Sequence, residues 1–293
     1  IEKEKYEVLI TPEEETQLLI AKNINRFNSK IKIPITKFEK INFVRNKLKL
    51  ILFAEKLGIP CPKFQDKAQF PMVIKPIIGA GARGIKYING PKEIIYDKDY
   101  LIQEYIPGDE YYGVSVIFNR KNKMRSAFVH KKLRQFPVTG GCSTYAVSVK
   151  YPLLVELTEK LLSKIGWHGI ANAEFKIDSR DGFPKLMEVN PRLWGSLELA
   201  VASGVNFPYM LYELALTGDI KPQFDYEVGK KFRWIIHGDF LNFISNFNLD
   251  FFKFFEKNTT HAVWSIRDPL PIFGNMLSLI DFLTSKEMKK FRD

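Results

Sequence analysis

Two apolar segments, 170–178 and 184–190, flank a short polar turn that contains Gly182, and this pattern predicts a β-hairpin. Both strands of this hairpin carry an acidic residue, Glu174 in the first and Glu188 in the second. Side chains at alternate positions of a strand share a face. The chain must therefore fold around a sheet that can hold two carboxylates side by side.

The register of the hairpin decides how close the two carboxylates come. Pairing Asp178 with Pro184 places Glu174 opposite Glu188, with Asn190 on the same face. Directly opposed side chains have Cβ atoms about 4.5–5.5 Å apart, and like charges there repel. Oxygen ligands of this kind suit Mg²⁺ held jointly with nucleotide phosphates, so the sequence predicts a metal site. A register shift of one residue would remove it.

The amino-acid composition excludes several classes of protein. The chain has 293 residues, 45% hydrophobic and 26% charged, which is typical of a soluble globular protein and excludes a disordered or coiled-coil chain. The sequence has no window of about 18 uninterrupted apolar residues, so no membrane span is predicted. The net charge of +11 favours an anionic partner, although a lysine-rich surface without special function is equally consistent with it. Cys61 and Cys142 have no metal or redox spacing and the four histidines form no metal-binding pair, so a reduced, cytoplasmic protein is predicted.

A lysine followed by a glycine-rich loop forms a second candidate site. Segment 72–75 reads as a strand that ends at Lys75, and the loop Gly79–Gly84 follows it. Backbone N–H groups of such a loop can surround phosphate oxygens, which the lysine neutralises. The order is wrong for a Walker loop and for a dinucleotide fingerprint. A glycine-rich hairpin turn with a surface lysine is the alternative.

Segment 101–110 is an apolar strand that is interrupted by Pro107-Gly108. Main-chain groups left unpaired after such a strand can recognise an adenine edge, and a nearby carboxylate can bind ribose hydroxyls. An ordinary strand–turn–strand connection explains the same residues.

Lys132 and Arg134 lie two positions apart on a predicted strand, and could therefore point together at phosphate or at a carboxylate substrate. A solvated basic edge is the alternative. The segment Gln135–Thr144 that follows is predicted to be mobile without ligand, because it offers little apolar surface to bury. Cys142 is not expected to act as a nucleophile, since no partner base is implied.

The remaining elements follow from periodicity and turn residues. Helices are predicted at 46–57, 152–164, 196–203 and 207–216, and strands at 6–10, 72–75, 85–88, 101–106, 111–118, 124–133 and 144–149. A helix is also predicted to begin at Thr11–Glu14. This mixture predicts an α+β enzyme of several lobes.

A run of phenylalanines near the C-terminus keeps helical spacing, with Asn248 and Asp250 as the residues that could interrupt it. Its members are Phe240, Phe243, Phe247, Phe251 and Phe254. A packed core or a dimer surface is the expected role, and a helix on a membrane surface is the alternative.

Several of these motifs, in this order, resemble the ATP-grasp superfamily, specifically the single-module proteins similar to half of the large chain of carbamoyl-phosphate synthase. The resemblance covers roughly residues 42–225. It is carried by Asn46-Lys47 before a helix, by Lys75 with Gly79–Gly84, by Glu174, Glu188 and Asn190, and by Arg192-Leu193-Trp194-Gly195-Ser196. Asn46 stands where the family usually has aspartate. The resemblance implies an ATP-grasp fold, in which two α+β lobes clasp ATP.

The resemblance also implies a role for each matching residue. ATP would be bound by Lys47, Lys75, Gly79, Gly81, Gly84, Gln103, Glu104, Ile106 and Glu110; Gln103, Glu104 and Ile106 would read the adenine through their main chains and Glu110 the ribose. Glu174, Glu188 and Asn190 would hold Mg²⁺, as two ions. Arg192 and Lys75 would act in catalysis. Apart from the resemblance, Arg134 is also expected to act in catalysis, and Lys132, Gly140, Gly141 and Ser196 are expected to contact the substrate.

The expected organisation has three parts. Residues 1–45 are the remnant of a truncated N-terminal α/β domain, so a longer chain or a separate companion fragment is expected. Residues 46–225 form the ATP-grasp domain, with a small lobe at 62–106 and a large lobe at 107–225. Residues 226–293 form a basic, phenylalanine-rich extension.

The expected function is an ATP-dependent ligase that activates a carboxylate as an acyl phosphate and joins it to the amine of an amino acid or peptide, releasing ADP and phosphate. One alternative is phosphorylation of bicarbonate or carbamate, as in carbamoyl-phosphate synthase, with partner subunits. A second alternative is a nucleotide-binding module without chemistry. No nucleic-acid partner and no transmembrane segment are expected. A homodimer, and peripheral membrane contact through the phenylalanine-rich C-terminus, are left open as alternatives.

Overall fold

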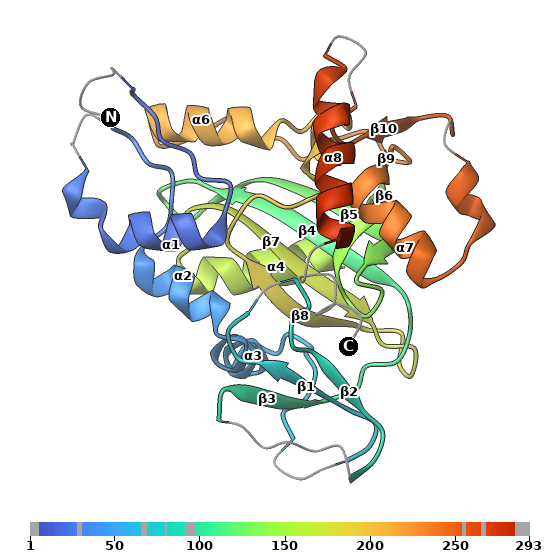
Figure 1. The fold of residues 1–293 in the computed structure, drawn as a ribbon. Coiled ribbons are helices and arrows are strands. Elements are labelled where there is room, and N and C mark those ends of the chain that lie inside the picture. Colours follow the sequence, from blue (N-terminus) through green and yellow to red (C-terminus); the bar gives the residue numbers. More distant parts are fainter. Residues whose placement is uncertain are drawn as a thin grey trace.

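The computed structural model describes residues 6–27, 31–65, 69–79, 81–91, 98–253, 256–264 and 268–284. They form a small three-stranded sheet and a large seven-stranded sheet, with helices around both (Figure 1). The two sheets matter for function because the predicted site residues come from both of them.

The small sheet has the strand order β2-β1-β3 and is antiparallel. Its strands are β1 (Met72–Pro76), β2 (Lys86–Ile88) and β3 (Tyr100–Glu104). Met72 and Ile74 are buried with Ile88 in the small core of this lobe. Because side chains alternate along a strand, Val73 and Lys75 project to the other side, where they line a cavity.

The large sheet has the order β10-β9-β6-β5-β4-β7-β8. Its strands are β4 (Tyr111–Phe118), β5 (Met124–Phe136), β6 (Cys142–Val149), β7 (Gly169–Ile177), β8 (Pro184–Asn190), β9 (Lys231–Arg233) and β10 (Thr259–His261). Neighbouring strands are antiparallel except for β9 and β10, which are parallel. Two strands from beyond residue 225 therefore extend this sheet.

Each face of the large sheet has its own core. The helices are α2 (Phe38–Arg45), α3 (Lys47–Lys56), α4 (Pro152–Ile165), α5 (Leu197–Ala202) and α6 (Phe207–Thr217). On one face Val114, Val116 and Phe118 are buried in a cluster that includes residues of α2, α3 and α4. On the other face Ile117 and Phe128 pack with residues of α5 and α6. The polar residues of this second face lie toward the small sheet, where they form the site.

The prediction of a strand at residues 6–10 is wrong. In this segment Val8 forms an isolated parallel bridge with Lys32, and among the described residues no sheet strand lies beside it. The helix predicted to follow is present as α1 (Glu14–Lys22), with a 3₁₀ turn, η1 (Ile24–Arg26), after it.

The helical stripe of phenylalanines is interrupted near Asn248 and Asp250, the residues at which the sequence suggested an interruption. The C-terminal elements are η3 (Ile235–Asp239, a π-helical turn), α7 (Phe240–Ser245), η4 (Leu249–Phe252) and α8 (Leu270–Thr284). Helix α7 ends at Ser245, and the side chain of Asn248 accepts a hydrogen bond from Asp250 N and starts a new turn. The chain folds back so that the rings of Phe243 and Phe251 stack at 4.7 Å. Phe254 lies outside the described residues.

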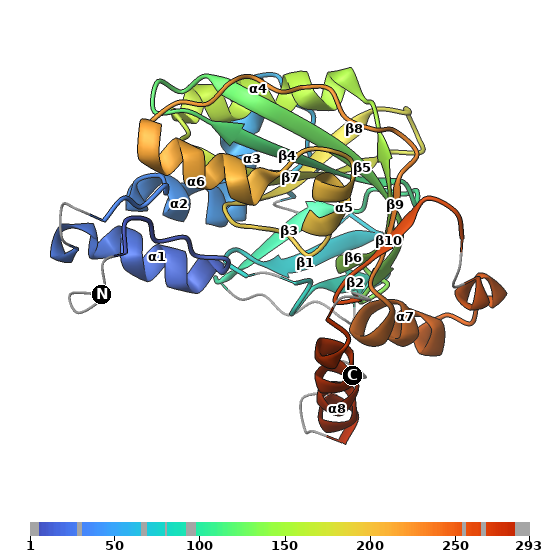
Figure 2. The same cartoon turned by 90° about the horizontal axis from the view of Figure 1, so that it is seen from above.

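Helix α8 stands out from the body of the molecule (Figure 2). Several of its apolar side chains, including Leu270, Phe273, Leu277 and Ile280, are exposed. None of the described helices is long and apolar enough to cross a membrane.

Candidate active site

The hairpin brings Glu174 and Glu188 together as predicted. Glu174 pairs with Glu188, and Asn172 with Asn190. The predicted pairing of Asp178 with Pro184 is wrong, because Ile177 takes that position. A β-bulge after Glu174 places one extra residue in β8 and shifts the register back by one.

The two carboxylates converge on one atom of Asn190. Its Nδ2 lies 3.4 Å from Glu174 Oε1 and 3.1 Å from Glu188 Oε1. Lys132 Nζ donates to Glu174 Oε2 at 2.7 Å, and Lys47 Nζ lies 3.8 Å from Glu188 Oε2. Each carboxylate thus has a lysine on one side, while both accept from the same electropositive amide nitrogen.

This geometry fits a divalent cation. Burial raises the pKa of Glu174, Lys132 opposes this shift, and the neighbouring Glu188 adds to it. A cation between the carboxylates would relieve that repulsion. Among the described residues no three acidic, histidine or cysteine side chains form a metal cluster, so the ion would need further oxygens, such as those of nucleotide phosphates.

Two lysines lie beside these carboxylates. Lys75 is buried, and its burial, reinforced by the charge of Lys47 and opposed by Glu188, lowers the pKa of Lys75 to about 8. Lys47 is the first residue of α3, which Asn46 caps by accepting from Lys49 N at 2.9 Å. The Lys47 ammonium donates to Gly79 O, and its main-chain N donates to Ile77 O at 2.9 Å. The start of the glycine loop is thus tied to the start of a helix.

The loop itself needs glycine at two of the predicted positions. Gly81 and Gly84 have φ of +68° and +73°, a region that side chains with a Cβ rarely adopt. A Cβ at Gly84 would lie 3.0 Å from Cγ of Pro76. The loop can therefore turn sharply over β1, with its backbone free to approach a ligand.

A narrow cavity of about 80 Å³ separates the two sheets. Its walls include Lys47, Val73, Lys75, Ala82, Tyr87, Gln103, Glu104, Tyr105, Ile106, Tyr111, Thr139, Gly140, Glu174, Lys176 and Glu188. Ligand pockets are usually several hundred Å³, so a nucleotide requires this cavity to widen. A hydrogen bond links its two sides, because the Tyr87 hydroxyl of the small sheet donates to Thr139 O of the turn between β5 and β6.

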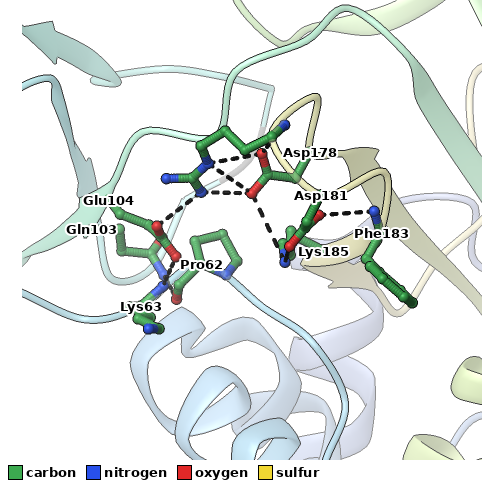
Figure 3. A network of polar contacts seen from close by, with 9 residues as sticks. Pro62, Lys63, Gln103, Glu104, Asp178, Asp181, Phe183 and Lys185 are labelled. Atoms are coloured by element: carbon green, nitrogen blue, oxygen red, sulfur yellow. Dashed lines mark hydrogen bonds and ion pairs between the residues drawn. The ribbon is translucent and has the colours of Figure 1, made fainter.

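The predicted adenine segment is fixed by its side chains (Figure 3). Gln103 Nε2 donates to Pro62 O at 3.1 Å, and Glu104 Oε1 accepts from Lys63 N at 2.9 Å. Arg180 binds Glu104 at 3.0 Å and Asp178 at 2.5 Å, so it joins the end of β3 to the β7–β8 turn. These side chains hold the segment in place, and Gln103, Glu104 and Ile106 line the cavity.

Other predicted residues are placed nearby. Gly141 O accepts from Lys132 Nζ at 3.1 Å, and Gly140 lines the cavity. Ser196 is buried, with its Oγ 3.3 Å from Nε2 of His130. Glu110 is bound by Lys131 and by the Tyr112 hydroxyl, and is absent from the cavity walls.

The expectation that Lys132 and Arg134 point together is wrong. A β-bulge between them breaks the alternation of β5, so Arg134 pairs with Tyr145 and its guanidinium lies 4.4 Å from that ring. Arg134 binds the buried carboxylate of Asp239 through Nε at 2.5 Å and Nη2 at 2.7 Å. The structure therefore does not bring Arg134 to the glutamates.

Two further residues of the cavity were missed at the level of sequence. Lys176 is buried, with its ammonium 4.9 Å from the ring of Tyr111 and 5.2 Å from that of Tyr105. Lys176 lies two positions from Glu174, so the alternation that placed the glutamates would also have found it. No local signal identifies Tyr87, because its contact is with a turn distant in sequence.

A second, wider cavity of about 850 Å³ begins at the glycine loop. Gly79, Gly81 and Arg83 line it, while Ala82 lines the first cavity. Arg192 and Cys142 border it on the side of the large sheet. The glycine loop thus lies at the boundary between the narrow cavity beside the glutamates and the wide cavity beside Arg192.

Two sheets with a lysine-bearing strand, a glycine loop and a paired-glutamate hairpin between them define the ATP-grasp fold, and comparison with solved structures shows the same fold. A biotin carboxylase complex from Campylobacter jejuni aligns with a TM-score of 0.65 at 16% identity, over 77% of this chain and 58% of that one. An L-amino acid ligase from Bacillus licheniformis aligns with a TM-score of 0.57 at 20% identity, over 73% of this chain and 59% of that one. The chain thus has the ATP-grasp fold.

Sequence comparison finds similarity to ligases and to a carbamoyl phosphate synthase chain. Residues 96–235 match the family described as ATP-grasp in the biosynthetic pathway with Ter operon. A D-aspartate ligase of Enterococcus faecium is 26% identical over 127 residues, which are 40% of this chain and 29% of that enzyme. The large chain of carbamoyl phosphate synthase of Pyrococcus furiosus is 23% identical over 223 residues, covering 66% of this chain and 20% of that one. The chain spans less than a third of either curated relative.

Lys75→Ala is expected to weaken ADP binding roughly ten- to a hundredfold, since a charge-assisted contact contributes about 1.5–3 kcal/mol. Because the pKa of Lys75 is about 8, the Lys75 amine of the free protein is already protonated below pH 8. Above pH 8 binding must take up a proton, so wild-type affinity should fall as pH rises, and this slope should vanish in the variant. Calorimetry from pH 6.5 to 9.5 measures both, with the exposed Lys49→Ala as control. Equal affinity for Lys75→Ala and Lys49→Ala would remove Lys75 from the site.

Tyr87→Phe is expected to open the narrow cavity more readily, because it removes the hydroxyl that binds Thr139 O while keeping the ring. Losing one neutral hydrogen bond costs about 0.5–1.5 kcal/mol, so ADP should associate roughly three- to tenfold faster in stopped-flow experiments. Hydrogen exchange at residues 137–141 should also increase without ligand and be suppressed by MgADP. Tyr209→Phe, at an exposed position of α6, is the control. Identical association rates in the two variants would mean that this contact does not close the cavity.

Proposed function

We propose that the chain is an ATP-dependent ligase that activates a carboxylate as an acyl phosphate and joins it to an amine. The observation that carries the proposal is the arrangement of the two compartments along the glycine loop. The narrow one contains Lys75 and the glutamate pair, and the roomy one contains Arg192. A nucleotide in the first would direct its terminal phosphate toward the second.

The nucleotide would be held from several sides. Lys47 and Lys75 would neutralise phosphate oxygens, and the backbone of Gly79, Gly81 and Gly84 would approach them closely. The main chains of Gln103, Glu104 and Ile106 would contact the adenine. Tyr105, Tyr111 and Lys176 border the same cavity and would lie beside the base or the ribose. Mg²⁺ held by Glu174, Glu188 and Asn190 would neutralise charge on the transferred phosphoryl group.

The reaction has two steps. A carboxylate oxygen attacks the terminal phosphorus, and the bond to the bridging oxygen breaks so that ADP leaves. The amine nitrogen then attacks the acyl carbon, phosphate departs with the C–O electron pair, and the nitrogen loses a proton. Arg192 would stabilise the acyl phosphate by charge. The turn 137–141, when closed, would keep out water that hydrolyses this intermediate.

Hydroxylamine trapping tests this function without knowledge of the amine. An acyl phosphate reacts with hydroxylamine to give a hydroxamate, so MgATP, hydroxylamine and a panel of amino acids and short peptides should yield hydroxamate and ADP in equal amounts. Arg192→Ala should lose this activity and still bind MgADP. A protein that binds MgADP but turns over ATP with no member of the panel would be the nucleotide-binding module.

Phosphorylation of bicarbonate or carbamate is the second candidate, favoured by the match to the large chain of carbamoyl phosphate synthase. The size of the second cavity, about 850 Å³, favours a larger carboxylate. ADP release that depends on bicarbonate alone would decide for this alternative.

A further inference from the structure

The wide cavity has an apolar wall that comes largely from the C-terminal extension. Trp234, Leu241 and Phe282 line it together with Phe136 and Pro137 from the end of β5. Trp234 follows β9, Leu241 lies on α7 and Phe282 on α8. Residues after 225 therefore face the compartment of Arg192.

The aromatic part of this wall is a continuous row. The rings of Trp234 and His237 stack with centroids 6.3 Å apart and an interplanar angle of 22°. His237 meets Phe282 at 6.4 Å with an angle of 60°. Such a row offers a broad apolar surface, on which a ring or a large aliphatic group can pack.

The part of the row formed by Trp234 and His237 is held in place by the sheet. The π-helical turn Ile235–Asp239 carries His237. Turns of this kind are rare in proteins, and those that occur are often found at functional sites. A Cβ at Gly238 would lie 2.9 Å from Thr144 Cγ2 and 3.0 Å from Trp234 Cε3, so the turn packs tightly against the tryptophan ring. The carboxylate of Asp239 anchors the turn to the sheet through Arg134 and Arg233.

The other sides of the cavity carry charge. Arg192, Arg83 and the glycine loop form the end next to the nucleotide compartment, where a carboxylate must lie in order to be phosphorylated. Three glutamates, Glu13, Glu14 and Glu15, form a further rim, and Arg45 binds only the last two of them. This rim has an excess of negative charge, which disfavours an acidic side chain and suits an amine.

We infer that the carboxylate substrate carries an aromatic or large apolar side chain, which packs against Trp234 and Phe282 while its carboxylate lies at Arg192. This inference rests on the proposed ligase function and names the substrate class of the same site. The glutamate rim disfavours a substrate with an acidic side chain.

The test compares carboxylates that differ only in a phenyl group. L-Phenylalanine against L-alanine and 3-phenylpropanoate against propanoate are the two pairs, with L-aspartate as the acidic probe, all in the hydroxylamine assay with MgATP. Each phenyl compound should exceed its partner in kcat/KM by on the order of tenfold or more, and L-aspartate should be the poorest.

The variants Trp234→Ala and Phe282→Ala locate the effect. Each should raise KM for the phenyl compounds by on the order of tenfold more than it raises KM for L-alanine, because only the phenyl compounds lose a ring contact with the substrate. Phe247→Ala, an exposed position of the same extension, is the matched control. Thermal melts and turnover of L-alanine show that the variants are folded.

The failure of this inference differs from failure of the ligase function. Equal kcat/KM within both pairs, or variants that behave like Phe247→Ala, would overturn the apolar subsite while the ligase function stands. If no carboxylate gives hydroxamate, binding of 3-phenylpropanoate and propanoate to the MgADP-loaded protein, measured by ligand-observed NMR, decides the matter. Preferential binding of the phenyl compound that Trp234→Ala abolishes would support the subsite, and its absence would overturn it.

Discussion

Glu188→Gln is expected to reduce ATP turnover by on the order of a hundredfold or more, with the fold intact. The substitution keeps size and removes one of the two charges that would bind Mg²⁺, so charge developing on the phosphoryl group loses its stabilisation. Glu188 is the better choice of the pair, because Glu174 also neutralises Lys132, a buried lysine. Only a weak contact of 3.8 Å links Glu188 to Lys47.

Thermal melts separate this effect from unfolding. Without ligand, Glu188→Gln should melt at or slightly above the wild-type temperature, since repulsion with Glu174 is relieved. Wild type should gain stability when Mg²⁺ is added together with ADP, and the variant should lose the metal-dependent part of that gain. Glu159→Gln, on the exposed side of α4, is the control. If Glu188→Gln matches this control in both turnover and MgADP stabilisation, the metal site is not at this hairpin.

Asp239→Ala is expected to have the largest effect on stability. Asp239 is fully buried and binds Arg134 and Arg233, both themselves largely buried. Removing the carboxylate leaves two guanidinium groups without their shared partner, which typically costs about 3–5 kcal/mol. For a chain of this size the melting temperature should fall by roughly 10 °C.

Asp250→Ala is the matched control, because Asp250 pairs with Lys253 at the surface, where both side chains are more than half exposed. Such pairs contribute about 0–1 kcal/mol, so this variant should melt close to wild type. Hydrogen exchange in Asp239→Ala should rise mainly at residues 231–245, which Asp239 ties to β5. Equal melting temperatures for the two variants would show that Asp239 does not anchor the C-terminal extension.

The site was predictable wherever its residues are close in sequence. Glu174, Glu188 and Asn190 lie on one hairpin, and Lys75 with its glycine loop on another short segment, so alternation and turn residues were sufficient to propose both. The helix at α3 was also predictable, because Asn46 caps it and apolar residues follow at helical spacing. Local interactions decide all of these features.

The tertiary structure decided the features that depend on bulges and distant contacts. The bulge after Glu174 corrected a register that the turn alone would have misplaced, and the bulge between Lys132 and Arg134 sent these side chains in different directions. A bulge adds one residue to one strand of a pair, and alternation along the sequence does not reveal where this happens.

The wide cavity also could not be predicted from the sequence. Its walls combine residues from α1, the glycine loop, the β5–β6 turn and α8, which span nearly the whole chain. The sequence by itself determined the motifs proposed to bind the nucleotide, because each is formed within a short segment. Packing of the C-terminal extension onto β6 and onto Arg134 of β5 determined which side chains face Arg192, since this depends on contacts between segments about a hundred residues apart.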